Sequence, residues 1–405
     1  MSVWYLDDGT VVGSVEDVFR VFERIQAKGP ARGLFLNVRK TEIWWPNRAE
    51  KDPFPADVDR VKNDGVKLLG APIGTEKWTA EFVKKKLTAL KEVQGLLKEV
   101  DNAQVEFGLF RGCLQFNKIN HLLRACPPHI LNDTLKKFDD HFHDMVAEIL
   151  RVGCLSEEQW EQASLPVRYA GLGVAQTRQV AGAAFVGSCA LTRDLVAAIL
   201  KRESYHPDGV TELLADHAHT TGKPHEFEAL TRERSVQETL SSERHEAALE
   251  RLKAKSSTRT RNLLLACSMP HASDWLMCPP VPSLGLSMRS EGFRAALKYR
   301  LGIPVFEKPL PCQALSSEGK ILDVFGDHAV CCHHSPSLVF RHNSVRDILG
   351  HAARGAGLTA VVLEKKNLVP GSKSKPGDIS VQHYHRGFAS TAFDVTISHP
   401  LQLKS

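Results

Sequence analysis

The chain has 405 residues, 42% of them hydrophobic and 24% charged, which is ordinary for a globular protein of two or three domains. The sequence shows neither a secretory signal nor an apolar run as long as a membrane span, so we expect an intracellular protein, nuclear or cytoplasmic, without a transmembrane segment. Its nine cysteines are then expected to be reduced thiols or metal ligands rather than a disulfide framework.

The charge is unevenly distributed along the chain. Of 52 basic and 47 acidic residues, 20 basic and 10 acidic ones fall in residues 251–405, which gives +10 there. Residues 1–250 hold the other 32 and 37, which gives −5. A basic C-terminal part suits contact with nucleic acid, although an ordinary basic surface would look the same in composition.

Residues 3–13 predict two short strands joined by a tight turn, with Gly9 supplying the positive φ that an Asp-Gly turn needs. Asp7 and Asp8 would lie side by side at its tip, and carboxylate oxygens are ligands of hard cations such as Mg²⁺. A solvated acidic turn is the alternative, because turns favour Asp and Gly for local reasons. Next come an expected helix over residues 14–28, capped by Ser14, and an expected strand over residues 34–45.

Three motifs follow one another over about the first 75 residues. They are Tyr5-Leu6-Asp7-Asp8, then Gly33-Leu34-Phe35-Leu36-Asn37 with Lys40-Thr41, then Leu68-Leu69-Gly70-Ala71-Pro72-Ile73-Gly74. The region resembles the C-terminal half of the palm in non-LTR retroelement reverse transcriptases. The resemblance implies a catalytic, Mg²⁺- or Mn²⁺-binding role for Asp7 and Asp8, and contacts to RNA or DNA at Lys40 and Gly70. It also implies a partner Asp on an upstream strand that this sequence lacks, so we expect no polymerase activity from this chain alone.

Helical patterns cover residues 77–100, 104–125 and 131–151. The first carries Lys84 and Lys85, which would hold a template–primer duplex if this region is similar to the family's thumb, or form a solvated face if it is not. Residues 203–226 are polar and rich in His, and we expect an exposed linker there. A metal role for these His residues stays open, but their irregular spacing favours the linker.

The C-terminal part first shows an order of residues that resembles the Cys/His knuckle of R-two-like non-LTR elements. That resemblance implies Cys312, His328 and Cys332 as zinc ligands. Leu315 stands where the second Cys of the pair would be, so Cys331, His333 or His334 would have to supply the fourth ligand. Buried thiols beside a His-rich turn are the alternative. Arg341 and His342 follow, at positions that the resemblance assigns to nucleic-acid contact.

Three acids then fall at the edges of successive expected strands: Glu364, Asp378 and Asp394. They resemble the catalytic acids of the PD-(D/E)xK nuclease core, which binds a divalent metal and cleaves a phosphodiester. The family's lysine two residues after the last acid is Thr396 here, and Lys375 or Lys373 would have to replace its charge. The solvent face of a sheet is the alternative for such acids.

The fold class expected from these patterns is α+β and predominantly helical. A partial palm would occupy residues 1–76, a helical thumb-like region 77–202, a linker with a connecting helix 203–262, a helical segment with the knuckle 263–345, and a truncated restriction-like endonuclease core 346–405. The leading hypothesis is a retroelement-derived fragment that binds nucleic acid and does not polymerise. The alternatives are a metal-dependent DNA endonuclease and a non-catalytic helical scaffold.

Overall fold

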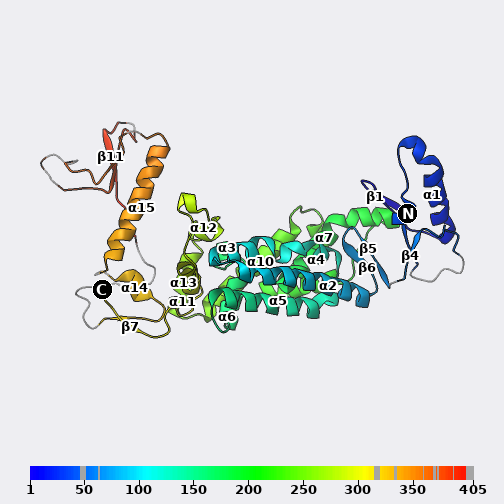
Figure 1. Cartoon of the computed structure of the whole chain (residues 1–405), viewed down its shortest axis with the longest axis horizontal. Coiled ribbons are helices and arrows are strands. Elements are labelled where there is room, and N and C mark those ends of the chain that lie inside the picture. The colour runs from blue at the N-terminus through cyan, green and yellow to red at the C-terminus, as the bar shows by residue number, and fades with distance from the viewer. Residues whose placement is uncertain are drawn as a thin grey trace. The chain divides into compact units, whose positions relative to one another are not determined.

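The computed structural model describes residues 1–45, 52–62, 64–313, 320–332, 335–358, 360–367, 371, 374–385 and 387–397. The chain forms two compact units, each made of two stretches of sequence. The first unit is Met1–Leu252 with Asp274–Phe293, and the second is Lys253–Ser273 with Arg294–Ser405. Helices predominate and the sheets are small, so the expected α+β class is confirmed (Figure 1). The five expected segments do not correspond to these two units.

The chain begins with a hairpin of β1 (Ser2–Tyr5) and β2 (Asp8–Val11). Tyr5 pairs with Asp8, so the turn is formed by Leu6 and Asp7, and Leu6 has the positive φ, 54°. The prediction that Gly9 supplies it is wrong. Gly9 lies within β2 opposite Trp4, whose ring would be 2.5 Å from a Cβ at this position. Glycine is therefore needed here for side-chain packing and not for backbone conformation.

Helix α1 (Val15–Lys28) begins as predicted, with the Ser14 side chain accepting a hydrogen bond from the Asp17 N–H. Its buried Phe22 packs on Phe54 with ring centroids 5.5 Å apart. The long strand expected over residues 34–45 is mostly wrong, because only β3 (Glu42–Trp44) forms, parallel to β4 (Asp59–Val61). The short helices η1 (Pro30–Arg32) and η2 (Val38–Lys40) precede β3.

The hairpin β5 (Gly65–Leu68) and β6 (Ala71–Gly74) leads into a bundle of helices (Figure 1). The predicted helices are present, and the second is split at η4. The helices of the bundle are, in order, α2 (Glu76–Gly95), η3 (Leu96–Glu99), α3 (Ala103–Cys113), η4 (Phe116–Lys118), α4 (Asn120–Ala125), α5 (Pro128–Leu150), α6 (Glu157–Ser164), η5 (Val167–Tyr169) and α7 (Thr177–Leu200). Helix α7 packs on both α4 and α5, and α5 packs on α2. Fully buried Phe107, Phe110, Phe138 and Phe142 form part of this core.

The expected linker is instead part of the first unit's core. Helices α8 (Val210–Thr221), α9 (Phe227–Leu230) and α10 (Val236–Lys255) bury apolar side chains against α7. Val210 and Leu230 are completely inaccessible to solvent, which a solvated linker would not allow. Farther along the chain, α12 (Asp274–Met277), η6 (Pro282–Leu284) and the start of α13 (Ser290–Arg300) return to α3, where Phe293 packs on Phe107.

Helix α7 is the one helix of the described chain that is long and apolar enough to cross a membrane, judged by length and composition. Of its apolar window, 39% is buried inside the protein. Core helices of globular proteins pass the same test, so the described residues include no clear membrane span.

The second unit contains α11 (Thr258–Cys267), a hairpin of β7 (Leu310–Pro311) and β8 (Ile321–Leu322), the short helix α14 (Asp327–Cys331), and α15 (Pro336–Gly355). Strands β9 (Val362–Leu363), β10 (Ile379–Gln382) and β11 (Ser390–Phe393) form an antiparallel sheet in the order β11-β10-β9. Helix α15 packs on β9, and buried Val361, Ile379 and Val381 form the small core beneath it.

Candidate functional site

The register of the C-terminal sheet aligns the three predicted acids. Ile379 of β10 pairs with Leu363 of β9 and with Phe393 of β11, so Asp378 lies between Glu364 and Asp394 at one end of the sheet. Backbone hydrogen bonds continue the ladder to these positions, from Glu364 N–H to Asp378 O and from Asp378 N–H to Phe393 O, both 2.8 Å. We call Glu364, Asp378 and Asp394 the acidic row.

Asp378 is the central and best-supported member of the acidic row. Its Oδ2 accepts a 2.7 Å hydrogen bond from the Val395 N–H and lies 3.2 Å from His342 Nε2 of α15. Burial opposes ionisation, but the Val395 N–H, His342 and Asp394 together outweigh it and lower the pKa of Asp378. The carboxylate is therefore ionised at neutral pH, as a metal ligand must be.

The Glu364 carboxylate is paired with two positively charged side chains, of which the sequence analysis had named only one. Its carboxylate contacts Lys375, which lies just before β10, and Arg346 of α15. The hydrogen bond from Lys375 lowers the pKa of Glu364. Lys375 thus brings a positive charge to the row, while Lys373 lies outside the described residues and Thr396 is exposed near Asp394. The sequence analysis did not identify Arg346. Its position four residues after His342 places both side chains on one face of a helix, and this spacing was the signal available in the sequence.

The three acids do not by themselves form a closed metal cage. Among the described residues, ligand atoms of three or more His, Cys, Asp or Glu side chains come within 4.8 Å of one another at two other places, and the acidic row is not one of them. The oxygen chemistry of Asp378 and Asp394 still suits Mg²⁺ or Mn²⁺, which keep several waters and need only one or two carboxylates.

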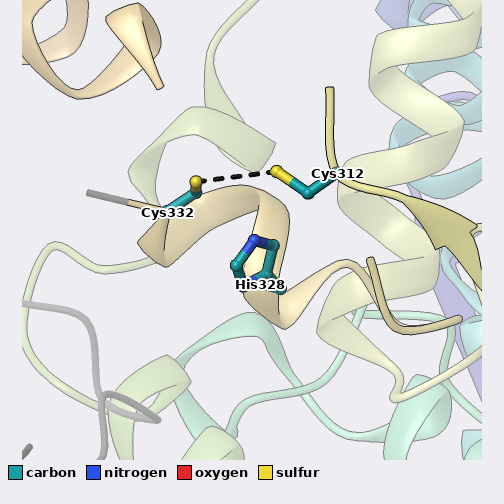
Figure 2. A group of neighbouring side chains, drawn as sticks. All are labelled: Cys312, His328 and Cys332. Atoms are coloured by element: carbon teal, nitrogen blue, oxygen red, sulfur yellow. Dashed lines mark hydrogen bonds between the residues drawn. The ribbon is translucent and has the colours of Figure 1, made fainter. Parts of the chain in front are cut away.

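The predicted knuckle residues do converge (Figure 2). The Sγ atoms of Cys312 and Cys332 are 3.8 Å apart, and the ligand atoms of Cys312, His328 and Cys332 all lie within 4.8 Å of one another. Among the residues that the structure describes, His328 Nε2 is buried and has no hydrogen-bond partner, so it is available to coordinate a metal ion. Two thiolates and one imidazole are ligands that Zn²⁺ prefers. Cys331 is not part of this group, and Leu315, His333 and His334 lie outside the described residues.

Neighbouring acids position the short helix that carries His328. Asp323 accepts hydrogen bonds from the backbone N–H groups of Phe325, Asp327 and His328, at 2.9, 3.2 and 2.7 Å. Asp327 in turn accepts two hydrogen bonds from Arg259 of α11, at 2.6 and 2.7 Å. These contacts fix α14 against α11 and thereby fix the orientation of two of the three knuckle residues.

The N-terminal acids are not gathered with others. Asp7 and Asp8 are both exposed on the first hairpin, and neither belongs to a group of three potential metal ligands among the described residues. One carboxylate pair on one strand does not make a two-metal centre. The geometry that polymerisation needs is therefore missing from the part of the chain that the structure describes.

The remaining predicted nucleic-acid residues lie at separate places. Lys40, Lys84 and Lys85 are exposed, and Lys84 pairs with Glu81 at 3.4 Å on the same helix. Gly70, with a φ of 86°, forms the turn between β5 and β6. Arg341 neighbours His342 on α15, and its Nε is buried with no hydrogen-bond partner in the described part of the chain. No protein-family model matches this chain, and no curated protein is significantly similar to it.

Proposed function

We propose that this chain derives from a non-LTR retroelement reverse transcriptase and that its second unit is a metal-dependent DNA endonuclease of the PD-(D/E)xK type. The order of the motifs along the sequence supports the origin. The observation that carries the activity is the register that brings Glu364, Asp378 and Asp394 to one end of one sheet.

Each group around the acidic row has a definable task in phosphodiester hydrolysis. Asp378 and Asp394 would hold Mg²⁺ or Mn²⁺, which supplies charge to the scissile phosphate and a water of lowered pKa. His342 orients Asp378 through their 3.2 Å contact. Lys375 and Arg346 are both paired with Glu364. Once partly released from it, their positive charges would stabilise an oxygen of the scissile phosphate. Water adds to phosphorus and releases a proton to solvent, the bond from phosphorus to one deoxyribose oxygen breaks, and that oxygen takes up a proton to become a hydroxyl group.

Nicking of supercoiled plasmid tests this proposal. We expect Mg²⁺- or Mn²⁺-dependent nicking by the full chain, abolished by a chelator. Asp378→Asn should reduce the rate by at least about 100-fold, because even residues that only support a metal ligand contribute 10–100-fold. Glu307→Gln, which changes an exposed acid of the same unit, is the matched control and should nick normally. Equal rates for the two variants would overturn the proposal and indicate a contaminating nuclease.

A second candidate is nucleic-acid binding without cleavage, and one observation favours it. The Glu364 carboxylate is already paired with Arg346 and Lys375, and Thr396 stands at the position of the family's lysine. In that case the wild-type chain would bind DNA or RNA with an affinity that falls steeply with salt, and would not nick. Absence of salt-sensitive binding would instead favour the scaffold hypothesis.

A further inference from the structure

Two histidines and one glutamate of the first unit meet in the region expected to be a linker. His217 lies on α8, His225 follows that helix in the connection to α9, and Glu243 lies on α10. Nε2 of each histidine is 2.8 Å from the same oxygen, Oε2 of Glu243. The three ligand atoms all lie within 4.8 Å of one another.

The cluster is buried at its centre. The His217 side chain is 3% exposed, and those of Glu243 and His225 are 15% and 20% exposed. His217 Nδ1 is also buried and has no hydrogen-bond partner among the described residues. Nδ1 is not the ring nitrogen that faces Glu243, so a cation held by Nε2 would not contact it. The three side chains are nevertheless brought together in a part of the first unit that is largely shielded from solvent.

Basic side chains flank the cluster. Arg244 is paired with Asp216 at 2.6 Å, whereas Lys223 Nζ is shared between Glu246 at 3.1 Å and Glu243 Oε1 at 3.7 Å, so Oε2 of Glu243 is the oxygen left to the two histidines.

We propose that His217, His225 and Glu243 bind one zinc ion, with water as the fourth ligand. Two imidazoles and one carboxylate are a known ligand set for Zn²⁺. With metal–ligand bonds of about 2.0–2.1 Å in a tetrahedron, two ligand atoms lie about 3.3–3.4 Å apart, so each nitrogen has to move about 0.5 Å farther from Glu243 Oε2 than its present 2.8 Å. The ion fastens the connection after α8 to α10. The site belongs to the first unit and does not depend on nuclease activity.

Zinc titration of the full chain tests the site directly. The protein carries Cys312→Ser and Cys332→Ser, so that the knuckle does not contribute, and is stripped with a chelator before calorimetry. We expect one equivalent of bound Zn²⁺ and a rise in Tm. His225→Gln should weaken binding at least tenfold, whereas His219→Gln, which changes an exposed histidine of α8, should not. Glu243→Gln and Glu246→Gln make a second matched pair.

Far-UV circular dichroism reports whether each variant keeps its helices, and cobalt absorption identifies the ligands without any further variant. Co²⁺ at this site should give visible d–d bands without a thiolate charge-transfer band. Failure of the folded double-serine protein to bind Zn²⁺, a thiolate band with Co²⁺, or equal binding by His225→Gln and His219→Gln would each overturn the proposal. If His225→Gln loses helical signal, the comparison of Glu243→Gln with Glu246→Gln decides, because Gln keeps the size of the side chain.

Discussion

The carboxylate of Asp139 on α5 lies at the N-terminus of α7. It accepts 2.6 Å hydrogen bonds from both the N–H and the hydroxyl of Thr177, and a 3.2 Å one from the Arg178 N–H. Burial nevertheless dominates and raises the pKa of Asp139 to about 6. Burial makes the ionised carboxylate of Asp139 unfavourable, while the same carboxylate satisfies N–H groups at the N-terminus of α7.

The raised pKa predicts a pH dependence of stability. The pKa of Asp139 in the folded chain exceeds the unfolded value, so its contribution is fully present below about pH 4 and is lost as pH rises through about 6. The free energy of unfolding of the wild type relative to Asp139→Asn should therefore be greater at pH 4 than at pH 7, by about 2–3 kcal/mol. Urea unfolding of both proteins at the two pH values measures this. A difference that is unchanged or smaller in acid would contradict the raised pKa.

Gly171 predicts a second effect of one residue. A Cβ here would lie 1.8 Å from the carbonyl oxygen of Leu165, which is backbone and cannot move aside. Gly171→Ala should destabilise the chain by about 3 kcal/mol or more, because overpacking forces a backbone shift. Gly108→Ala, in α3 where no atom lies within 4 Å, should stabilise by up to about 1 kcal/mol. Comparable effects of the two substitutions in denaturant unfolding would show that the close approach is not rigid.

At the scale of elements, sequence patterns predicted the long helices well. The apolar periodicity of α2 and α5 and the Ser14 cap of α1 are local signals, and each has its counterpart in the structure. The acids Glu364, Asp378 and Asp394 were also placed correctly at strand ends. Their alignment across the sheet could not be predicted, because register depends on the pairing between strands and not on either strand alone.

The errors have the same physical origin. Residues 203–226 are polar and look like a linker, yet a few apolar positions such as Val210 and Leu214 suffice to bury α8 against α7. The positive φ at Leu6 was not predicted because Gly9, three residues later, offered the conventional signal, whereas Gly9 instead packs against the Trp4 ring. The irregular spacing of His217 and His225 hid their convergence, since Glu243, the residue between them in space, lies on another helix.

The knuckle leads to a prediction for α14. This helix has only five residues, so its own hydrogen bonds stabilise it little. We expect it to depend on Asp323, Arg259 and a zinc ion held by the knuckle residues Cys312, His328 and Cys332. Cys332→Ser should lower the zinc content of the purified chain by one equivalent and increase proteolysis between residues 310 and 335. Cys331→Ser, the neighbouring thiol outside the cluster, is the control and should retain its zinc. Loss of zinc from both variants alike would place Cys331 among the ligands.

At the scale of the whole molecule, the N-terminal acids and the acidic row belong to different units. We expect no template-dependent primer extension by this chain with Mg²⁺ or Mn²⁺, because Asp7 and Asp8 have no third acidic ligand among the described residues. The double variant Asp7→Asn, Asp8→Asn should nick plasmid as the wild type does. Primer extension that this double variant abolishes would show that a polymerase centre assembles after all.

Helix α15 connects two members of the acidic row through one rigid body. His342 contacts Asp378 and Arg346 contacts Glu364, one helical turn apart. A substitution can remove either contact and leave the other in place, so the proposed nuclease centre can lose its supporting contacts one at a time. A single residue inserted between Pro336 and His342 would instead rotate the incoming segment by about 100° about the helix axis relative to the rest. Insertions and deletions before His342 would therefore change the orientation of a whole segment of the helix in a single step.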